Sequence, residues 1–449
     1  MSVMERKGCE KVDSFLMEVY IKDKKVKVLQ RGKPMVEFRK ANWSDLEQVL
    51  DLIEKGFSVQ QNSVNYQEGK VHRVLFSYLY SRPSWRPDHL WLAEEDNQII
   101  AAVGVFPQEL SFEGVRIPVW AVSPVVTHPD HRGKRAAVGC MEQMFYDLKN
   151  SGVPAVFLWG IPNYYPKFGF VPALARYQTR ITRKQVRRFE VATGRFREVV
   201  PEDLPVLAKL YTSFNRKYWL QPFRTESWWM ERGNEWDIED GDIKEVPFPK
   251  KENFKVWENL KGEITGYLYM QPDHVRQRIY LPESVASDLV TAKQMVGQLM
   301  EALPDEVTLV IRGTPEHYMN MAAFELGGTH VCPSPLAGMI KVLDWASFLT
   351  VLEPVLQRRL CGFGTFSGVL KYSMDGQTIR FEIEAGKVRI QLTGPEFISG
   401  ALNVKLSRLI LGIYNDEDWQ YLSGDAVAFI GPVLFPRKYP FIWDVNYLY

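Results

Sequence analysis

The chain has 449 residues, a hydrophobic fraction of 46%, and 55 basic against 54 acidic side chains. This balance argues against a broad nucleic-acid-binding surface, which needs an excess of positive charge, and the four cysteines lack the spacing of a metal site. We expect a few domains in a cytoplasmic protein with reduced thiols, with no signal peptide, membrane span or bound metal.

The first predicted elements are a short strand at Phe38-Arg39 and an amphipathic helix after it. Ser44 and Glu47 have the spacing of a capping box, so we expect this helix to begin there. Apolar residues recur on one helical face, which is typical of a helix packed on a core. They are Leu46, Val49, Leu50, Ile53 and Phe57.

A candidate anion-binding loop lies in the segment 126–137, VTHPDHRGKRAA. Its order predicts a strand, a sharp turn at His128-Pro129, and then the first turn of a helix. The first N–H groups of a helix have no internal partner and carry partial positive charge, so a phosphate or pyrophosphate fits there. The small residues Gly133, Ala136 and Ala137 would let phosphates approach the backbone. An ordinary strand-to-helix turn with solvated charges is the alternative.

A second informative segment is Tyr165–Phe170, YPKFGF, which follows a short apolar strand, Val153–Trp159. Together with the loop it resembles the acetyl-CoA-binding core of the GNAT N-acetyltransferases. The phosphate loop of that family has the form Arg/Gln-x-x-Gly-x-Gly/Ala, and a Tyr-x-Lys/Arg-x-Gly-Phe segment follows it. Arg135 stands where the family usually has its middle glycine.

The chain repeats part of its pattern. Phe38-Arg39 followed by Asp45-Leu46 has the same spacing as Phe196-Arg197 followed by Asp203-Leu204. We therefore expect a second copy of one α/β domain, with coincidence as the alternative. The second copy has Tyr280–Ser284 where the loop would be, and the acidic Glu283 would repel a pyrophosphate. This copy should keep the fold without the cofactor and form a wall of the substrate cleft.

A third region begins after Trp345. A helix-like stretch, 348–360, precedes strands that alternate strictly, with Ile379, Phe381 and Ile383 on one face. An amphipathic helix follows, with Leu402, Leu406, Leu409 and Ile410 on one side. This pattern predicts an antiparallel sheet with a helix on one face, in an α+β domain. The order of elements resembles the sterol carrier protein fold.

The whole arrangement resembles the Eis-like (enhanced intracellular survival) acetyltransferases. The resemblance implies a mixed α/β, α+β chain with an N-terminal extension (1–35), a catalytic GNAT domain (36–180), a degenerate GNAT domain (181–345) and a sterol carrier protein-like domain (346–449). It also implies acetyl-CoA as co-substrate, primary amines such as aminoglycosides, polyamines or lysine as acceptors, and a homo-oligomer, either a hexamer or a trimer.

The resemblance assigns roles to individual residues. The strand residues Val125, Val126 and Thr127 would offer backbone groups to the pantetheine arm. The pyrophosphate would be surrounded by Arg132, Gly133, Lys134, Arg135, Ala136 and Ala137. Tyr165 would be the general acid, with core packing as its alternative role, and the α-carboxylate of Tyr449 would be the base. Asn163 would bind the cofactor or only shape its turn.

Two questions stay open at the level of sequence. Five carboxylates lie within Glu235–Asp242, and they would either attract cationic amines or, as we favour, form a solvated loop. The protein could also be a non-catalytic binding protein for acyl-CoA or lipid. An acyltransferase of protein N-termini is a third candidate, because some of those enzymes also pair two GNAT halves. They end with the second half, however, whereas this chain continues into a third region, which argues against this candidate.

Overall fold

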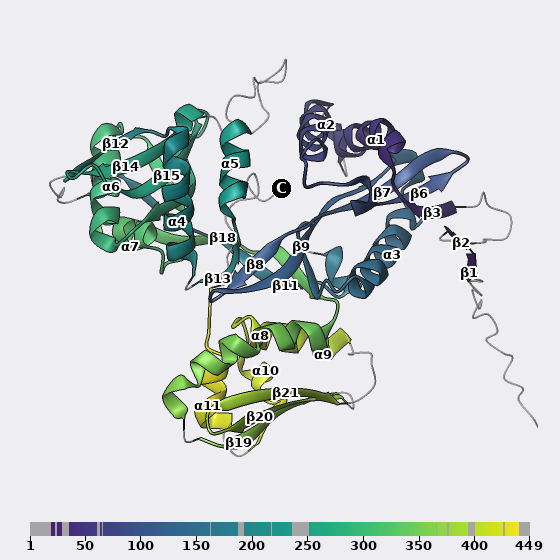
Figure 1. Cartoon of the computed structure of the whole chain (residues 1–449). Helices are drawn as coiled ribbons and strands as arrows, with labels where there is room; N and C mark the ends of the chain where they lie inside the picture. The colour runs from purple at the N-terminus through teal and green to yellow at the C-terminus, as the bar shows by residue number, and fades with distance from the viewer. Residues whose placement is uncertain are drawn as a thin grey trace, which may run out of the picture. The chain divides into compact units, whose positions relative to one another are not determined.

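A computed structural model describes residues 19–22, 25–28, 36–60, 63–64, 66–161, 163–186, 193–216, 218–235, 251–364, 366–374, 377–393, 400–424 and 427–439. The chain forms two compact units. The first comprises Met1–Gly104 and Pro124–Met144, and the second comprises Val105–Ser123 and Phe145–Tyr449. Figure 1 shows the elements of both in chain order.

The first unit is built on an antiparallel sheet in the order β1-β2-β3-β6-β7. The strand β7 is buried from Ile99 onward, which explains its continuous apolar sequence. The strands of this unit are β1 (Val19–Lys22), β2 (Lys25–Val28), β3 (Val36–Lys40), β4 (Val59–Gln60), β5 (Ser63–Val64), β6 (Leu90–Glu95) and β7 (Gln98–Phe106). Its helices are α1 (Leu46–Ser58), α2 (Tyr66–Tyr80) and the start of α3 (Ala136–Asn150).

The capping box before α1 is formed by Asn42 and Asp45, and not by Ser44 and Glu47 as expected. The side chain of Asn42 accepts a hydrogen bond from the amide of Ser44 (2.9 Å), and the carboxylate of Asp45 accepts one from the amide of Asn42 (2.8 Å). The expected box is wrong because a 3-10 turn, Trp43–Asp45, precedes the helix and is itself capped by Asn42. The centre of the expected apolar face is buried: Val49, Leu50 and Ile53.

The second unit contains a sheet in the order β9-β10-β18-β11-β17-β16-β15-β14-β12. The pairs β9–β10 and β16–β17 are parallel, and the other neighbours are antiparallel. Strand β18, which comes late in the chain, lies between β10 and β11 and pairs with both. Strand β8 pairs with β9 and β13.

The bounds of these strands are β8 (Glu109–Phe112), β9 (Val115–Thr127), β10 (Ala155–Trp159), β11 (Val171–Thr182), β12 (Gly194–Glu198), β13 (Trp219–Pro222), β14 (Phe254–Asn259), β15 (Ile264–Asp273), β16 (Arg278–Ala286), β17 (Thr308–Arg312) and β18 (Thr329–Val342). The helices between them are α4 (Leu204–Asn215), α5 (Glu226–Glu235), α6 (Leu289–Ala302) and α7 (Tyr318–Glu325). The expected strand at 153–159 is present as β10.

Two strand-to-helix entries, β3–α1 and β12–α4, share one ion-pair arrangement. Arg39 on β3 binds Asp45, just before α1, at 2.7 Å. Arg197 on β12 binds Asp203, just before α4, also at 2.7 Å. Each arginine also binds a glutamate of the neighbouring strand, at 2.8 and 2.7 Å: Glu94 and Glu258. The repeated sequence spacing thus corresponds to a repeated contact that ties the end of a strand to the start of a helix.

The region after β18 forms a separate four-stranded antiparallel sheet in the order β21-β20-β19-β22. The expected alternation is confirmed on β20, where Ile379, Phe381 and Ile383 are buried. Phe381 meets Phe435 edge to face, with ring centres 5.3 Å apart, so side chains fill this interior. Figure 1 shows α8 and α9 above the strands. The elements are α8 (Trp345–Arg359), β19 (Gly368–Met374), β20 (Gln377–Glu384), β21 (Lys387–Thr393), α9 (Gly400–Ile410), α10 (Asp416–Trp419), β22 (Leu422–Ser423) and α11 (Val427–Leu434).

A buried ion pair lies in the core of the second unit. Arg224 donates two hydrogen bonds to Glu283 on β16, at 2.7 and 2.8 Å, and Tyr267 donates a third at 2.7 Å. The guanidinium stacks against the rings of Tyr211 and Trp228, with its carbon 4.2 and 4.3 Å from the ring centres. The expectation that Glu283 repels a pyrophosphate is wrong, because its charge is enclosed and neutralised by Arg224.

This pair predicts a large loss of stability when only one charge is removed. We expect E283Q to lower the free energy of unfolding by about 3–5 kcal/mol, because a buried guanidinium then lacks its counter-charge. The double variant Arg224→Met with Glu283→Leu removes both charges and should cost much less. Urea unfolding followed by tryptophan fluorescence measures both, and an E283Q protein as stable as the parent would contradict this prediction.

Candidate functional site

The segment between β9 and α3 is a loop with two left-handed residues. After β9 ends at Thr127, a 3-10 turn, Pro129–His131, follows the predicted sharp turn. Gly133 and Arg135 have φ angles of +84° and +62°. The helix that we expect directly after the turn at His128-Pro129 begins later, at Ala136, because left-handed residues cannot continue a right-handed helix.

Arg135 adopts a conformation that glycine adopts without strain. A left-handed conformation costs a residue with a Cβ about 1–2 kcal/mol. The family motif has glycine at this place, so the loop keeps the backbone path that the glycine would allow. At Gly133 a Cβ would meet no atom within 4 Å, so the requirement there comes from the φ angle and not from crowding.

The start of α3 offers unpaired amides. Among the described residues, no acceptor is recorded for the backbone N–H groups of 133–137, and the first turn of α3 contains no acidic side chain. The start of α6 is different, because Asp288 accepts a hydrogen bond from the amide of Thr291 (2.7 Å) and brings a negative charge. An anion would therefore be attracted to the first helix and repelled from the second.

The cationic side chains of the loop contact the protein itself. Lys134 and His131 both contact the carboxylate of Glu95, each at 2.9 Å, and Glu95 is only 6% exposed. Arg132 donates to the carbonyl groups of Gly56 (3.0 Å) and Val59 (2.7 Å). The side chains of Arg132 and Lys134 thus hold the loop in shape, and their expected place around a pyrophosphate stays a prediction.

The remaining predicted cofactor residues lie at the ends of regular elements. Val125 and Thr127 are half-buried at the end of β9, while Val126 between them is buried, as expected for alternation along a strand. The small side chains of Ala136 and Ala137 are buried in the first turn of α3. Arg135 is exposed, which leaves its guanidinium open to a ligand.

The Tyr165 segment forms a short 3-10 turn, Tyr165–Phe168, in the second unit. Tyr165 is half-buried, and its ring meets Tyr164 and Phe170 edge to face, with ring centres 5.1 and 5.9 Å apart. A Cβ on Gly160 would lie 2.3 Å from the Tyr165 ring, so only glycine admits this ring position. Packing therefore holds the ring of Tyr165. Asn163, just before the turn, is exposed.

Two residues that the sequence analysis missed contact this turn. Lys341 on β18 donates to the carbonyl of Phe168 (2.7 Å), and Asn403 on α9 donates to the carbonyl of Gly169 (2.9 Å). Both are remote in sequence from the turn, and neither belongs to a recognisable motif. Only the pairing of β18 with β10 and β11, and the approach of α9, reveal them.

Two predicted features lie outside the described residues. These are Tyr449, the expected base, and positions 236–242, which hold four of the five carboxylates of the acidic segment. The described chain ends at Tyr439, whose ring meets Tyr177 on β11 edge to face at 5.6 Å. Just before it, Lys438 binds Glu113 at 2.9 Å, and Arg359 binds the same carboxylate at 2.9 Å.

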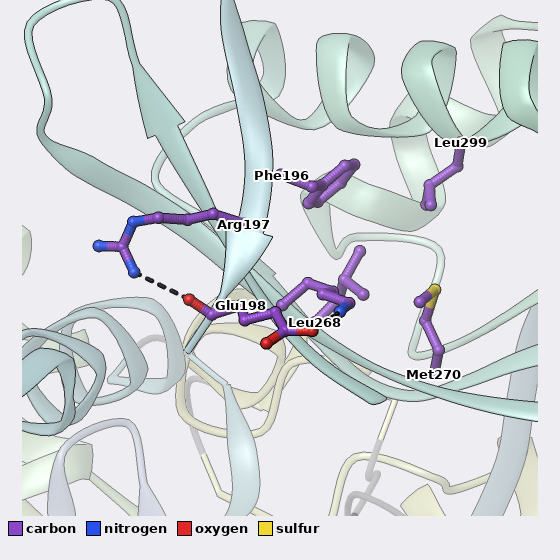
Figure 2. A pocket seen from close by; sticks show the side chains of 7 residues that line it. Phe196, Arg197, Glu198, Leu268, Met270 and Leu299 are labelled. Atoms are coloured by element: carbon purple, nitrogen blue, oxygen red, sulfur yellow. Dashed lines mark hydrogen bonds and ion pairs between the residues drawn. The ribbon is translucent and has the colours of Figure 1, made fainter. Parts of the chain in front are cut away.

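A pocket of about 270 Å³ lies in the second unit, and none of the predicted site residues lines it. Figure 2 shows its apolar side chains and the polar side chains of Arg197 and Glu198 at one edge. Its polar edge is already paired, because Arg197 binds Asp203 and Glu258, and Lys255 binds Glu198 at 3.3 Å. The lining residues are Phe196, Arg197, Glu198, Lys255, Leu268, Met270 and Leu299.

The described residues contain neither a metal-binding cluster nor a membrane-spanning helix. In this part of the chain, no group of three or more His, Cys, Asp or Glu side chains is arranged to hold a metal ion. None of the helices formed by these residues is both long enough and apolar enough to cross a bilayer.

Comparison with known proteins identifies the first part of the chain. Residues 37–173 match the family described as acetyltransferase (GNAT) domain, and this range contains both the loop and the Tyr165 turn. The chain thus contains a GNAT acetyltransferase domain. No curated protein matches the sequence.

Several solved structures resemble the chain over 91% of its length and 99% of theirs. They include a probable N-acyltransferase from Enterococcus faecalis V583 (15% identity, TM-score 0.63) and a GCN5-related N-acetyltransferase from Anabaena variabilis (12%, 0.63). Eis1 from Mycobacterium abscessus is also similar (15%, 0.55). At these identities the likeness establishes a shared mixed α/β fold.

The contacts of Glu95 predict a pH-dependent contribution to stability. Hydrogen bonding from Lys134, together with the charges of Lys134 and His131, lowers the pKa of Glu95. The ionised form is thus favoured in the folded state, and its stabilisation is present above the unfolded pKa of about 4.3 and lost as the pH falls through the folded pKa.

We expect Glu95→Gln to lower the urea midpoint at pH 7 and to lower it less at an acidic pH well below 4.3, such as pH 3, because the stabilisation by the ionised carboxylate shrinks as the pH falls below the unfolded pKa of about 4.3. Urea titrations of both proteins at the two pH values measure this difference. The prediction fails if the gap between the variant and the parent is the same at both.

Proposed function

We propose that the protein is an acetyl-CoA-dependent N-acetyltransferase that acts on primary amines by direct transfer between two bound substrates. The observation that carries this proposal is the uncapped start of α3 behind a left-handed loop, inside the segment that matches the GNAT family. Aminoglycosides, polyamines and lysine-like amines are the acceptors we propose.

The acetyl-CoA diphosphate would accept hydrogen bonds from the amides of 133–137, with Ala136 and Ala137 small enough for close approach. The exposed Arg135 supplies a further charge. The backbone of Val125–Thr127 would pair with the pantetheine arm, and Asn163 would contact the cofactor or shape its turn. The fold supports this assignment because α3, and not the Asp288-capped α6, presents unpaired amides.

The chemistry needs one proton acceptor and one proton donor. A free alkyl amine is mostly protonated near pH 7, so a base must remove a proton before the nitrogen attacks the thioester carbonyl. In the proposal, the terminal carboxylate of Tyr449 takes that proton. The neutral nitrogen then bonds to the thioester carbonyl carbon and forms a tetrahedral intermediate. When this intermediate collapses, the carbon–sulfur bond breaks, the Tyr165 hydroxyl protonates the departing thiolate, and the second proton of the nitrogen passes through solvent to restore the hydroxyl. Holding both substrates in position supplies much of the acceleration.

Contacts near the end of the described chain support a role for Tyr449. Lys438 and Tyr439 are held against Glu113 and against Tyr177 on β11. Ten residues, 440–449, follow, and an extended chain of that length spans at most about 33–36 Å. Strand β11 begins at Val171, just after the Tyr165 turn. The six residue steps of β11 from Val171 to Tyr177 span about 20 Å. The tail is therefore long enough to reach this turn.

The remaining parts of the proposal concern architecture. Residues 181–345 would be a second GNAT domain that no longer binds cofactor, which the repeated Arg–Asp–Glu contacts and the parallel pairs β9–β10 and β16–β17 support. Residues 346–449 would be a sterol carrier protein-like domain, which the buried face of the β19–β22 sheet supports. Homo-oligomeric assembly and a cytoplasmic location stay predictions.

The first test concerns Tyr165. We expect Tyr165→Phe to lower kcat roughly 100-fold, as for loss of a general acid, with little change in the Kd of acetyl-CoA. Thiol release with a panel of polyamines, lysine peptides and aminoglycosides measures turnover, and calorimetry measures binding. The neighbouring variant Tyr164→Phe is the control and should keep parental turnover.

An unchanged kcat in Tyr165→Phe would remove the general-acid role. If the parent protein bound acetyl-CoA but released no thiol with any amine, the alternative of a non-catalytic acyl-CoA-binding protein would replace the enzyme.

The second test concerns the terminal carboxylate. We expect a few residues added after Tyr449 to reduce kcat roughly 100-fold, because they move the proposed base away from the amine. The same residues added before Met1 are the control. Equal turnover by the two extended proteins would show that the carboxylate of Tyr449 is not the base.

A further inference from the structure

The last two carbonyl groups of the Tyr165 turn are held by side chains from distant parts of the chain. Gly169 ends this 3-10 turn in the left-handed conformation, with φ +82°. Lys341 donates to the carbonyl of Phe168 at 2.7 Å, and Asn403 donates to the carbonyl of Gly169 at 2.9 Å. The turn is therefore fixed by donors from β18 and α9, in addition to its own hydrogen bond.

The orientation of the Asn403 amide is determined by Trp345. The indole N–H of Trp345 can only donate, and it donates to the Asn403 oxygen at 3.1 Å. The nitrogen of the amide is thus turned toward Gly169. Asn403 and Trp345 are 7% and 5% exposed, so water competes little with these two bonds. Trp345, at the start of α8, and Asn403, on α9, both belong to the region after β18.

Lys341 is a partly buried cation close to the same turn. Its ammonium lies 4.9 Å from the centre of the Phe145 ring, and burial lowers its pKa. It would also lie 2.9 Å from a Cβ at Gly169, so a larger residue there would displace it. A hydrogen bond from a charged donor is stronger than a neutral one, so this contact restrains the Phe168 carbonyl firmly.

These restraints lead directly to the ring of Tyr165. Phe170, which follows Gly169, is 1% exposed and meets that ring edge to face at 5.9 Å. A Cβ at Gly160 would lie 2.3 Å from the same ring, so the ring keeps this position only because residue 160 has no side chain. Movement of the Phe168 and Gly169 carbonyls would shift Phe170 and the turn together, and with them the direction of the Tyr165 hydroxyl.

We infer that Asn403 and Lys341 are positioning residues for Tyr165, and that the region after β18 completes the acetyltransferase site through Asn403. The inference rests on the proposed function, in which Tyr165 is the general acid. A small misplacement of such a group reduces turnover without weakening the binding of the cofactor. We expect about a tenfold loss of kcat for each residue, with the KM for acetyl-CoA unchanged.

The experiment compares four variants of the full-length protein. Asn403→Asp keeps the acceptor for Trp345 but removes the donor to Gly169, and Lys341→Met keeps length but removes the other donor. Lys341→Arg should restore most of the turnover because it donates again. Ser407→Ala is the matched control, because Ser407 is buried one turn further along α9 and should leave kcat unchanged.

Each variant is also made in the Tyr165→Phe background. If the donors act through Tyr165, Asn403→Asp and Lys341→Met will cause no further loss there. An equal fold-loss in both backgrounds, or parental kcat in both single variants, would overturn the inference. Should Asn403→Asp fail to fold, Lys341→Met decides by the same criterion.

Hydrogen exchange of the peptide covering 163–171 separates this inference from the proposed function. Faster exchange in Asn403→Asp and Lys341→Met, with Ser407→Ala unchanged, supports the restraint on the turn. If exchange is faster but Tyr165→Phe keeps full turnover, the general-acid role is what has failed. Unchanged exchange in both donor variants would contradict the restraint itself.

Discussion

The placement of β18 between β10 and β11 is the constraint on which the second unit depends. Its hydrogen bonds to both neighbours join the strand that precedes the Tyr165 turn to the strand that follows it. Without β18, these two strands would have no backbone partners on their facing edges, and Lys341 would not lie near the turn. The strand also leads directly into α8, so it connects the turn with the region that contains Asn403.

Much of the candidate site could be predicted from local patterns. The strand, the turn at His128-Pro129 and the helix after it follow from residues adjacent in sequence, and so does the alternation of Ile379, Phe381 and Ile383. The repeated spacing of Arg and Asp also had a physical basis, since each pair is an ion pair at a helix start. These features depend on interactions within about ten residues, which sequence periodicity describes well.

The features that sequence reasoning missed depend on partners far away in the chain. Lys134 stands in a run of basic and small residues that predicts a phosphate site, and nothing in that local pattern indicates its contact with the distant Glu95. Glu283 looked like an open charge, yet Arg224 encloses it. The helix start was placed too early because arginine rarely adopts a positive φ, so Arg135 gave no sign of the left-handed loop that a glycine would have indicated.

The Asp288 cap on α6 affects how many acetyl-CoA molecules each chain would bind under the proposed function. A helix start that already holds its own carboxylate cannot compete for a diphosphate, whereas the start of α3 remains free to do so. Under the proposed function, only one of these two helix starts in each polypeptide would be available to the acetyl carrier. An assembly of several chains would load donor molecules in proportion to its subunits, and any cooperativity in loading would have to arise between chains and not within one.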